Sequence, residues 1–163
     1  MKSFIDNTGR TWMIVVNVAT IKRVRALCDV DLNSIVEIDE HNRPNTKLLE
    51  RLSTDPVLLV DVLYAVCKPE CDKNKVSDED FGASMVGDTI DYATDALLDE
   101  IVDFFPKAKR QAFQKILAAT RRFEEITKKR LKTVLEEPGL EENLASEMAR
   151  LTGLSSKPPE SAE

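Results

Sequence analysis

The chain has 163 residues, of which 42% are hydrophobic and 32% are charged, and its formal net charge is −6 at pH 7. A chain of this length can bury a full hydrophobic core without disulfides or metals, so we expect one soluble domain with appendages. The negative charge gives no electrostatic reason for the whole molecule to bind nucleic acid, and no apolar run is long enough to span a membrane. The N-terminus lacks the apolar core of a signal peptide, which predicts a cytoplasmic location.

Residues 3–16 have the pattern of a β-hairpin. The turn Asp6–Gly9 contains Asn and Gly, which tolerate the positive φ of tight turns, and the second arm is rich in aromatic and β-branched residues. A helix is predicted over Ile21–Cys28, with Arg23 among the residues that face water. A short strand is predicted around Ser34–Ile38, followed by a polar connection and a short helix.

An acidic segment, Asp55–Pro106, forms the centre of the chain. It contains thirteen Asp and Glu against three Lys, a net charge of −10. Ten of the eleven positions in Val57–Cys67 are apolar or aromatic, and a helix that is hydrophobic nearly all round must be covered on more than one side. We therefore predict that this is the central core helix, that Pro69 ends it, and that a loop follows as far as Val76.

Two further helices are expected in the acidic segment. Ser77-Asp78-Glu79-Asp80 is a helix-capping sequence, and the short helix behind it should stop at Gly87. From Asp88 a longer helix carries an apolar stripe on one face. Its opposite, acidic face consists of Asp91, Asp95, Asp99, Glu100 and Asp103. The residues assigned to the core are Val60, Leu63, Tyr64, Leu97, Leu98, Ile101 and Phe104.

The next segment reverses the charge. Residues 107–132 carry ten Lys and Arg against two Glu, a net charge of +8. Because Lys107–Glu137 lacks Gly and Pro and repeats apolar residues every three or four positions, it predicts one helix of about 45 Å. The fold class is therefore mainly α (α+β): a hairpin and acidic helical body over 1–106, a long basic helix over 107–137, and a short helix with a disordered tail over 138–163.

Catalytic chemistry finds little support in the residues. Asp91, Asp95 and Asp99 recur every four positions on a water-facing helical stripe, whereas catalytic acids need a cleft that perturbs them. There is no nucleophile motif and no glycine-rich phosphate loop. We predict no catalytic residue and no enzyme.

Metal binding is also not expected. The three cysteines lack the close spacing of structural zinc sites, and His41 is the only histidine. A Cys3His site assembled from Cys28, Cys67, Cys71 and His41 is the less favoured interpretation, because ligands can be remote in sequence. The favoured interpretation is that Cys28 and Cys67 are reduced residues on buried helix faces. We therefore predict no metal site and no cofactor.

The long basic helix is the best candidate for a binding surface. Its apolar stripe continues past the point where the body can cover it, and exposed apolar surface on a helix is typical of a site for another helix. The basic residues could instead follow phosphates, pair with an acidic protein or face solvent, but aromatic residues for stacking are few, so nucleic acid is the less favoured partner. The predicted partner-binding residues are Phe113, Ile116, Arg121, Arg122, Phe123, Ile126 and Leu131.

Three stretches together resemble the tail assembly chaperones of long-tailed bacteriophages and prophages. They are the opening F-I-D-N-T-G-R-T-W hairpin with A-T-I-K-R-V-R-A-L-C-D-V-D-L, the helix D-P-V-L-L-V-D-V-L-Y-A-V-C, and V-S-D-E-D-F-G-A-S-M-V-G-D-T-I-D-Y-A-T-D-A-L-L-D-E-I-V-D-F-F-P. The resemblance covers about residues 3–106.

The resemblance implies a non-enzymatic function. Such chaperones bind the tape measure protein, a long helical chain, keep it soluble, and help to recruit tail tube subunits before leaving the finished particle. It also implies homo-oligomer formation and a location in the host cytoplasm during assembly. Two alternatives remain open: a virion structural component such as a tail completion or connector protein, and a nucleic-acid-binding accessory protein that uses the basic helix.

Overall fold

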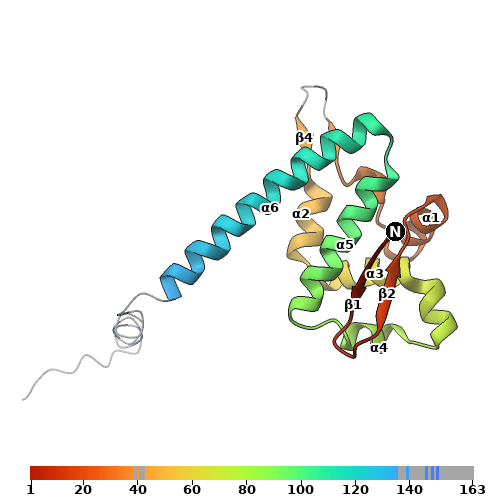
Figure 1. The fold of residues 1–163 in the computed structure, drawn as a ribbon, viewed down its shortest axis with the longest axis horizontal. Helices are drawn as coiled ribbons and strands as arrows, with labels where there is room; N and C mark the ends of the chain where they lie inside the picture. The colour runs from red at the N-terminus through yellow and green to blue at the C-terminus, as the bar shows by residue number, and fades with distance from the viewer. Residues whose placement is uncertain are drawn as a thin grey trace, which may run out of the picture. The chain divides into compact units, whose positions relative to one another are not determined.

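The computed structural model describes residues 1–38, 40, 43–135, 139, 146, 148 and 150. The chain divides into two compact units, Met1–Lys115 and Ile116–Glu163. Over the described residues the fold is mainly helical, with six α-helices and an N-terminal two-stranded antiparallel sheet (Figure 1). This confirms the predicted fold class. His41 and most of the predicted short C-terminal helix lie outside the described residues.

The predicted hairpin is present as β1 (Lys2–Ile5) and β2 (Thr11–Ile14). Gly9 has a φ of 83°, which a residue without a Cβ adopts without strain. Asp6, itself buried, accepts hydrogen bonds from Thr8, from the Arg10 amide and from Trp12 Nε1, the last at 2.8 Å. Burial would raise the pKa of Asp6, but these hydrogen bonds to the charged carboxylate hold the pKa below its ordinary value.

The next elements are short apart from one helix. They are α1 (Val18–Cys28), a 3-10 helix η1 (Leu32–Ser34), β3 (Glu37–Ile38), which pairs with β4 (Pro44–Asn45), and α2 (Lys47–Thr54). The predicted strand around Ser34–Ile38 is thus reduced to its last two residues. The Asp31 side chain accepts a hydrogen bond from the Asn33 amide and so caps the 3-10 helix η1. This helix occupies the residues in front of the strand.

The central helix α3 (Pro56–Asn74) packs against α1, α2, α4, α5 and β2. Its role as the central core helix is confirmed, and Asp55 caps its first turn in front of Pro56. The predicted end at Pro69 and the loop to Val76 are wrong, because the helix continues through Pro69 to Asn74.

Arg23 explains how the proline is accommodated. A proline has no N–H for the carbonyl four residues earlier, which here is that of Ala65. Arg23 Nε donates to the Ala65 carbonyl, and its terminal nitrogen donates to that of Val66 at 2.9 Å. The prediction that Arg23 faces water is therefore wrong: it supplies the hydrogen bond that Pro69 cannot.

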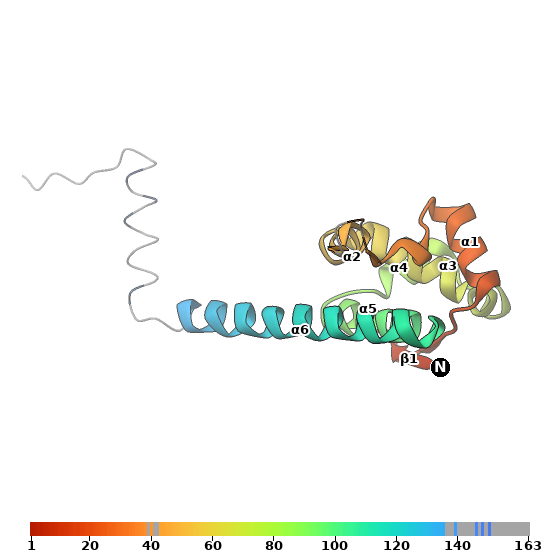
Figure 2. The same cartoon turned by 90° about the horizontal axis from the view of Figure 1, so that it is seen from above.

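Two helices complete the acidic segment: α4 (Asp78–Ala83) and α5 (Asp88–Phe104). The predicted cap is confirmed, since Ser77 and Asp80 form a reciprocal capping box. In the first unit α5 and β1 lie on one side and α1 to α4 on the other (Figure 2). Glu100, predicted on the water-facing side of α5, is buried and forms an ion pair of 3.0 Å with the amino group of Met1.

The core includes Leu63, Leu97, Leu98 and Ile101, as predicted, while Val60, Tyr64 and Phe104 are only half-buried. Helix α6 (Lys107–Leu135) starts in the first unit, directly after Pro106, and its residues from Ile116 to Leu135 belong to the second. Its Phe113 is 0% exposed and contacts the Phe105 ring edge-to-face, with 6.2 Å between centroids.

Candidate partner-binding surfaces

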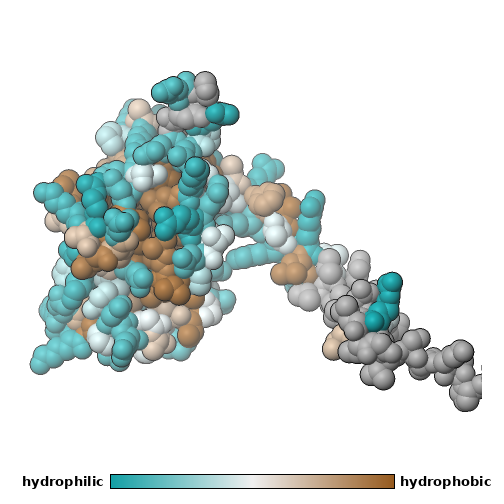
Figure 3. Space-filling model, turned by 180° about the vertical axis from the view of Figure 1, so that it is seen from behind, coloured by the Kyte–Doolittle hydropathy of each residue, from teal (hydrophilic) through white to brown (hydrophobic). Residues whose placement is uncertain are grey.

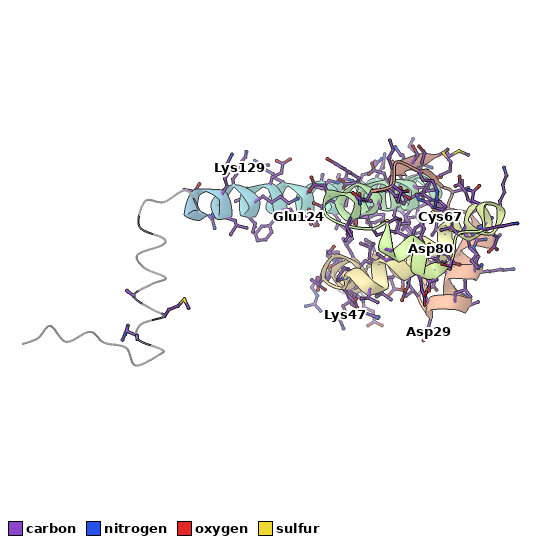
Figure 4. All side chains as sticks on the ribbon, turned by 90° about the horizontal axis from the view of Figure 1, so that it is seen from below. Asp29, Lys47, Cys67, Asp80, Glu124 and Lys129 are labelled. Carbon is purple, nitrogen blue, oxygen red and sulfur yellow. The ribbon has the colours of Figure 1, made fainter. Side chains whose placement is uncertain are left out.

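The second unit presents an apolar stripe on α6, consisting of Phe123, Ile126 and Leu131. All three side chains are exposed, Phe123 by 71%. They project within a sector of about 140° when placed at 100° per residue, so they lie on one side of the helix. Apolar surface is visible between polar side chains along this segment in Figure 3. Glu124 and Lys129 project outward from the same segment in Figure 4.

The remaining predicted partner-binding residues differ in accessibility. Arg122 is exposed, whereas Ile116 and Arg121 are half-buried. Phe113 is wholly enclosed, and this corrects its assignment to a partner surface: it is a core residue in contact with Phe105. Binding of a partner by the other residues stays a prediction.

Some basic residues of the first turns of α6 are engaged in the fold. Lys109 Nζ donates to the Asn33 carbonyl at 2.8 Å and lies 4.1 Å from the centroid of the Phe105 ring. Arg110 donates to the backbone carbonyls of Phe105 and Asp103. Two of the basic residues in 107–132 therefore form contacts within the fold next to Pro106. Fewer of these side chains are then available to bind phosphates.

The first unit carries an apolar groove between α3, α4 and the start of α5. It has a volume of about 340 Å³, and its lining includes Val57, Val60, Met85 and Ile90. Val57 is 70% exposed although it belongs to the helix predicted to be covered nearly all round. Apolar side chains also gather on a face of this unit in the space-filling view (Figure 3). A groove of this kind can receive one or two apolar side chains of a partner helix.

Carboxylates also line this groove. Asp61, Asp78 and Glu79 line it. Partial burial raises the pKa of Asp61, and the neighbouring charges of Asp78 and Asp55 raise it further. Like charges that destabilise one another favour the arrival of a cation, so basic residues beside the apolar positions of a partner would be attracted here.

Cys28 lies beside the same carboxylates. Its thiol is 3.5 Å from the Asp61 carbonyl, and burial, then Asp61 and Asp78, raise its pKa. Cys67 and Cys71 are buried, and burial raises their pKa values to about 12 and about 11. The prediction of a buried face holds for Cys67, whereas Cys28 is half-buried. All three thiols are disfavoured as thiolates, the form that attacks electrophiles or binds metals.

Within the described ranges, no three His, Cys, Asp or Glu side chains converge as metal ligands. In the same part of the chain, no helix is both apolar and long enough to cross a membrane.

The comparisons with known proteins leave the family open. No protein-family model, no curated protein and no solved structure matches the chain.

The groove on the first unit was missed by reasoning from the sequence. Val57 and Val60 belong to an apolar run whose pattern cannot show which turn of the helix lacks a neighbour. A usable signal is that Val57 stands in the first turn, directly after the Asp55 cap and Pro56, because helix ends are often less covered than helix centres.

Proposed function

We propose that this protein is a non-enzymatic assembly chaperone of the phage tail type, which binds the helical tape measure protein and aids the assembly of tail tube subunits. The observation that carries the proposal is the exposed apolar stripe on α6, in which Phe123 is 71% exposed. An amphipathic helix recognises such a stripe through apolar residues at three- and four-residue spacing. The resemblance of residues 3–106 to tail assembly chaperones supplies the identity of the client.

The apolar groove of the first unit supports the same function. Its lining of apolar side chains and carboxylates suits a helix that carries apolar and basic residues. Each of the two apolar surfaces would cover part of a long client helix and so oppose its self-association. The strongly negative acidic segment, net −10 over Asp55–Pro106, would keep such a complex dispersed.

The proposal is tested by co-expressing the chain with the tape measure protein, recognised as the long coiled-coil product encoded beside it. The chaperone should keep that product in the soluble fraction and co-purify with it at modest salt. Replacing Phe123 and Ile126 with Gln should abolish co-purification while the urea unfolding curve of the first unit stays unchanged. Loss of that unfolding transition would show that the two residues belong to the core.

A matched variant on the opposite side of α6 serves as the control. Glu125→Gln together with Lys129→Gln alters two exposed residues and leaves the net charge unchanged. This variant should retain the client. Equal loss of binding in both variants would contradict an apolar docking surface.

The alternatives predict other results. A chaperone should be absent from purified particles, whereas recovery of the chain from them by mass spectrometry would indicate a virion structural component. Retention of DNA or RNA that weakens steeply with salt would indicate a nucleic-acid-binding accessory protein.

A further inference from the structure

The chain carries two exposed apolar surfaces whose charges have opposite signs. One is the α6 stripe of Phe123, Ile126 and Leu131, which belongs to the second unit. The other is the apolar groove between α3, α4 and α5, which belongs to the first unit. Because one chain forms both surfaces, every second copy of the protein offers a complement to each of them at the same concentration.

The groove is acidic, and among the described residues no Lys or Arg lines it. Its charged lining residues, Asp61, Asp78 and Glu79, are exposed carboxylates. Burial and then the charges of Asp78 and Asp55 raise the pKa of Asp61. Burial and then the charges of Asp61 and Asp78 raise the pKa of the adjacent Cys28 thiol. Carboxylates that raise the pKa values of their neighbours in this way attract basic side chains of a partner.

The α6 stripe has basic residues at matching positions. Arg122 and Arg130 lie four residues before and four residues after Ile126, so the three side chains project from one side of the helix, one turn apart. Both arginines are exposed. Phe123 and Leu131 extend the apolar surface beside Ile126. A groove that received Ile126 would therefore meet a guanidinium group on either side of it.

Charge distinguishes the three ways in which two copies can cover these surfaces. Residues 116–135 of α6 contain six Lys and Arg against two Glu, so two stripes brought together would repel one another. Two grooves brought together would set carboxylates against carboxylates. The stripe of one copy in the groove of another instead joins apolar surface to apolar surface and positive charge to negative charge.

We propose that α6 of one copy docks in the groove between α3, α4 and α5 of a second copy, with Ile126 among the apolar side chains and Arg122 and Arg130 against the carboxylates. The apolar contact supplies affinity, and the pairs of arginine and carboxylate fix the orientation. Because the two surfaces differ, two copies can exchange their α6 helices reciprocally, or successive copies can join in a chain. The contact needs only this protein, so it does not rest on the proposed chaperone function.

Sedimentation equilibrium of the full chain, without a client, measures the association. The average mass should rise above that of one chain as the protein concentration increases, and added salt should weaken the association because charged groups form part of the contact. In a mixture of labelled and unlabelled copies, intermolecular NOEs should connect Ile126 with Val57 or Val60. The mass of a single chain at every concentration overturns the proposal, and so does association without these NOEs.

Two charge-reversed variants test the pairing directly. Arg122→Glu with Arg130→Glu makes the stripe acidic, and Asp61→Lys with Glu79→Lys makes the groove basic. Each variant alone should associate about tenfold more weakly than the unchanged protein, because like charges then meet in the contact. An equal mixture of the two variants should regain the association, because each stripe then finds a groove of opposite charge.

A matched control reverses two exposed acids outside the groove. Glu37→Lys with Asp103→Lys changes the net charge as much as the groove variant does and should associate like the unchanged protein. Equal weakening by this control, or undiminished association of either reversed variant alone, overturns the proposal. So does a mixture that stays monomeric although both variants keep the urea unfolding transition of the unchanged protein. If a variant fails to fold, the intermolecular NOEs of the unchanged protein decide.

Discussion

The interaction of Arg23 with the proline-containing turn of α3 leads to a quantitative prediction. Pro69 cannot donate to the Ala65 carbonyl, and Arg23 donates to that carbonyl and to the Val66 carbonyl instead. Replacing Arg23 with Ala removes both hydrogen bonds at once. The Ala65 carbonyl then has no donor on its own helix.

The expected cost follows from these two bonds. Hydrogen bonds from a charged donor contribute about 1.5 kcal/mol or more each, and Arg23 is half-buried, so water can replace part of what is lost. We expect Arg23→Ala to lower the free energy of unfolding by about 2 kcal/mol. In a Pro69→Ala background residue 69 supplies an N–H to the Ala65 carbonyl, and the cost should fall to about 1 kcal/mol.

The measurement is a double-mutant cycle on Arg23 and Pro69, with urea unfolding followed by circular dichroism at 222 nm. Arg25→Ala is the matched control, because Arg25 forms an exposed ion pair with Asp31 and should cost less than about 1 kcal/mol. The two changes should couple by about 1 kcal/mol. Losses that add within about 0.3 kcal/mol would refute the idea that Arg23 replaces the missing proline N–H.

Three further predictions concern other described residues. Because the pKa of Asp6 in the folded protein lies below its ordinary 3.8, Asp6 stabilises the fold above pH 3.8, and this contribution is lost as pH falls through the folded pKa. Urea unfolding at several pH values should show that Asp6→Asn removes this acid-dependent part and lowers the free energy of unfolding at pH 7. Cys67 and Cys71, with pKa values raised to about 12 and 11, should resist iodoacetamide at pH 8 until the chain unfolds, and rapid native labelling detected by mass spectrometry would contradict their burial. Phe113→Ala should cost about 3–5 kcal/mol in thermal or urea unfolding and Phe123→Ala less than about 0.5 kcal/mol, and similar costs would refute the division of α6 into a buried and an exposed part.

The local elements follow largely from local chemistry. The turn Asp6–Gly9, the cap Ser77–Asp80 and the break at Pro106 are each set by residues within four positions of one another, so their patterns are readable without a fold. The long helix beyond Pro106 follows in the same way from an unbroken apolar repeat. The mainly α fold with an N-terminal hairpin was predictable for this reason.

Long-range contacts decided the rest. Arg23, far away in sequence, donates to the Ala65 and Val66 carbonyls in the turn before Pro69. The amino group of Met1, from the start of the chain, pairs with the buried Glu100 on α5. Helical periodicity placed Phe113 and Phe123 on one stripe, yet Phe105 covers the first and Phe123 is exposed. The sequence by itself determined most of the elements and their apolar faces, because these follow from caps, breaks and periodicity within a few residues; the tertiary structure alone decided which faces are covered, since coverage depends on what neighbours reach them.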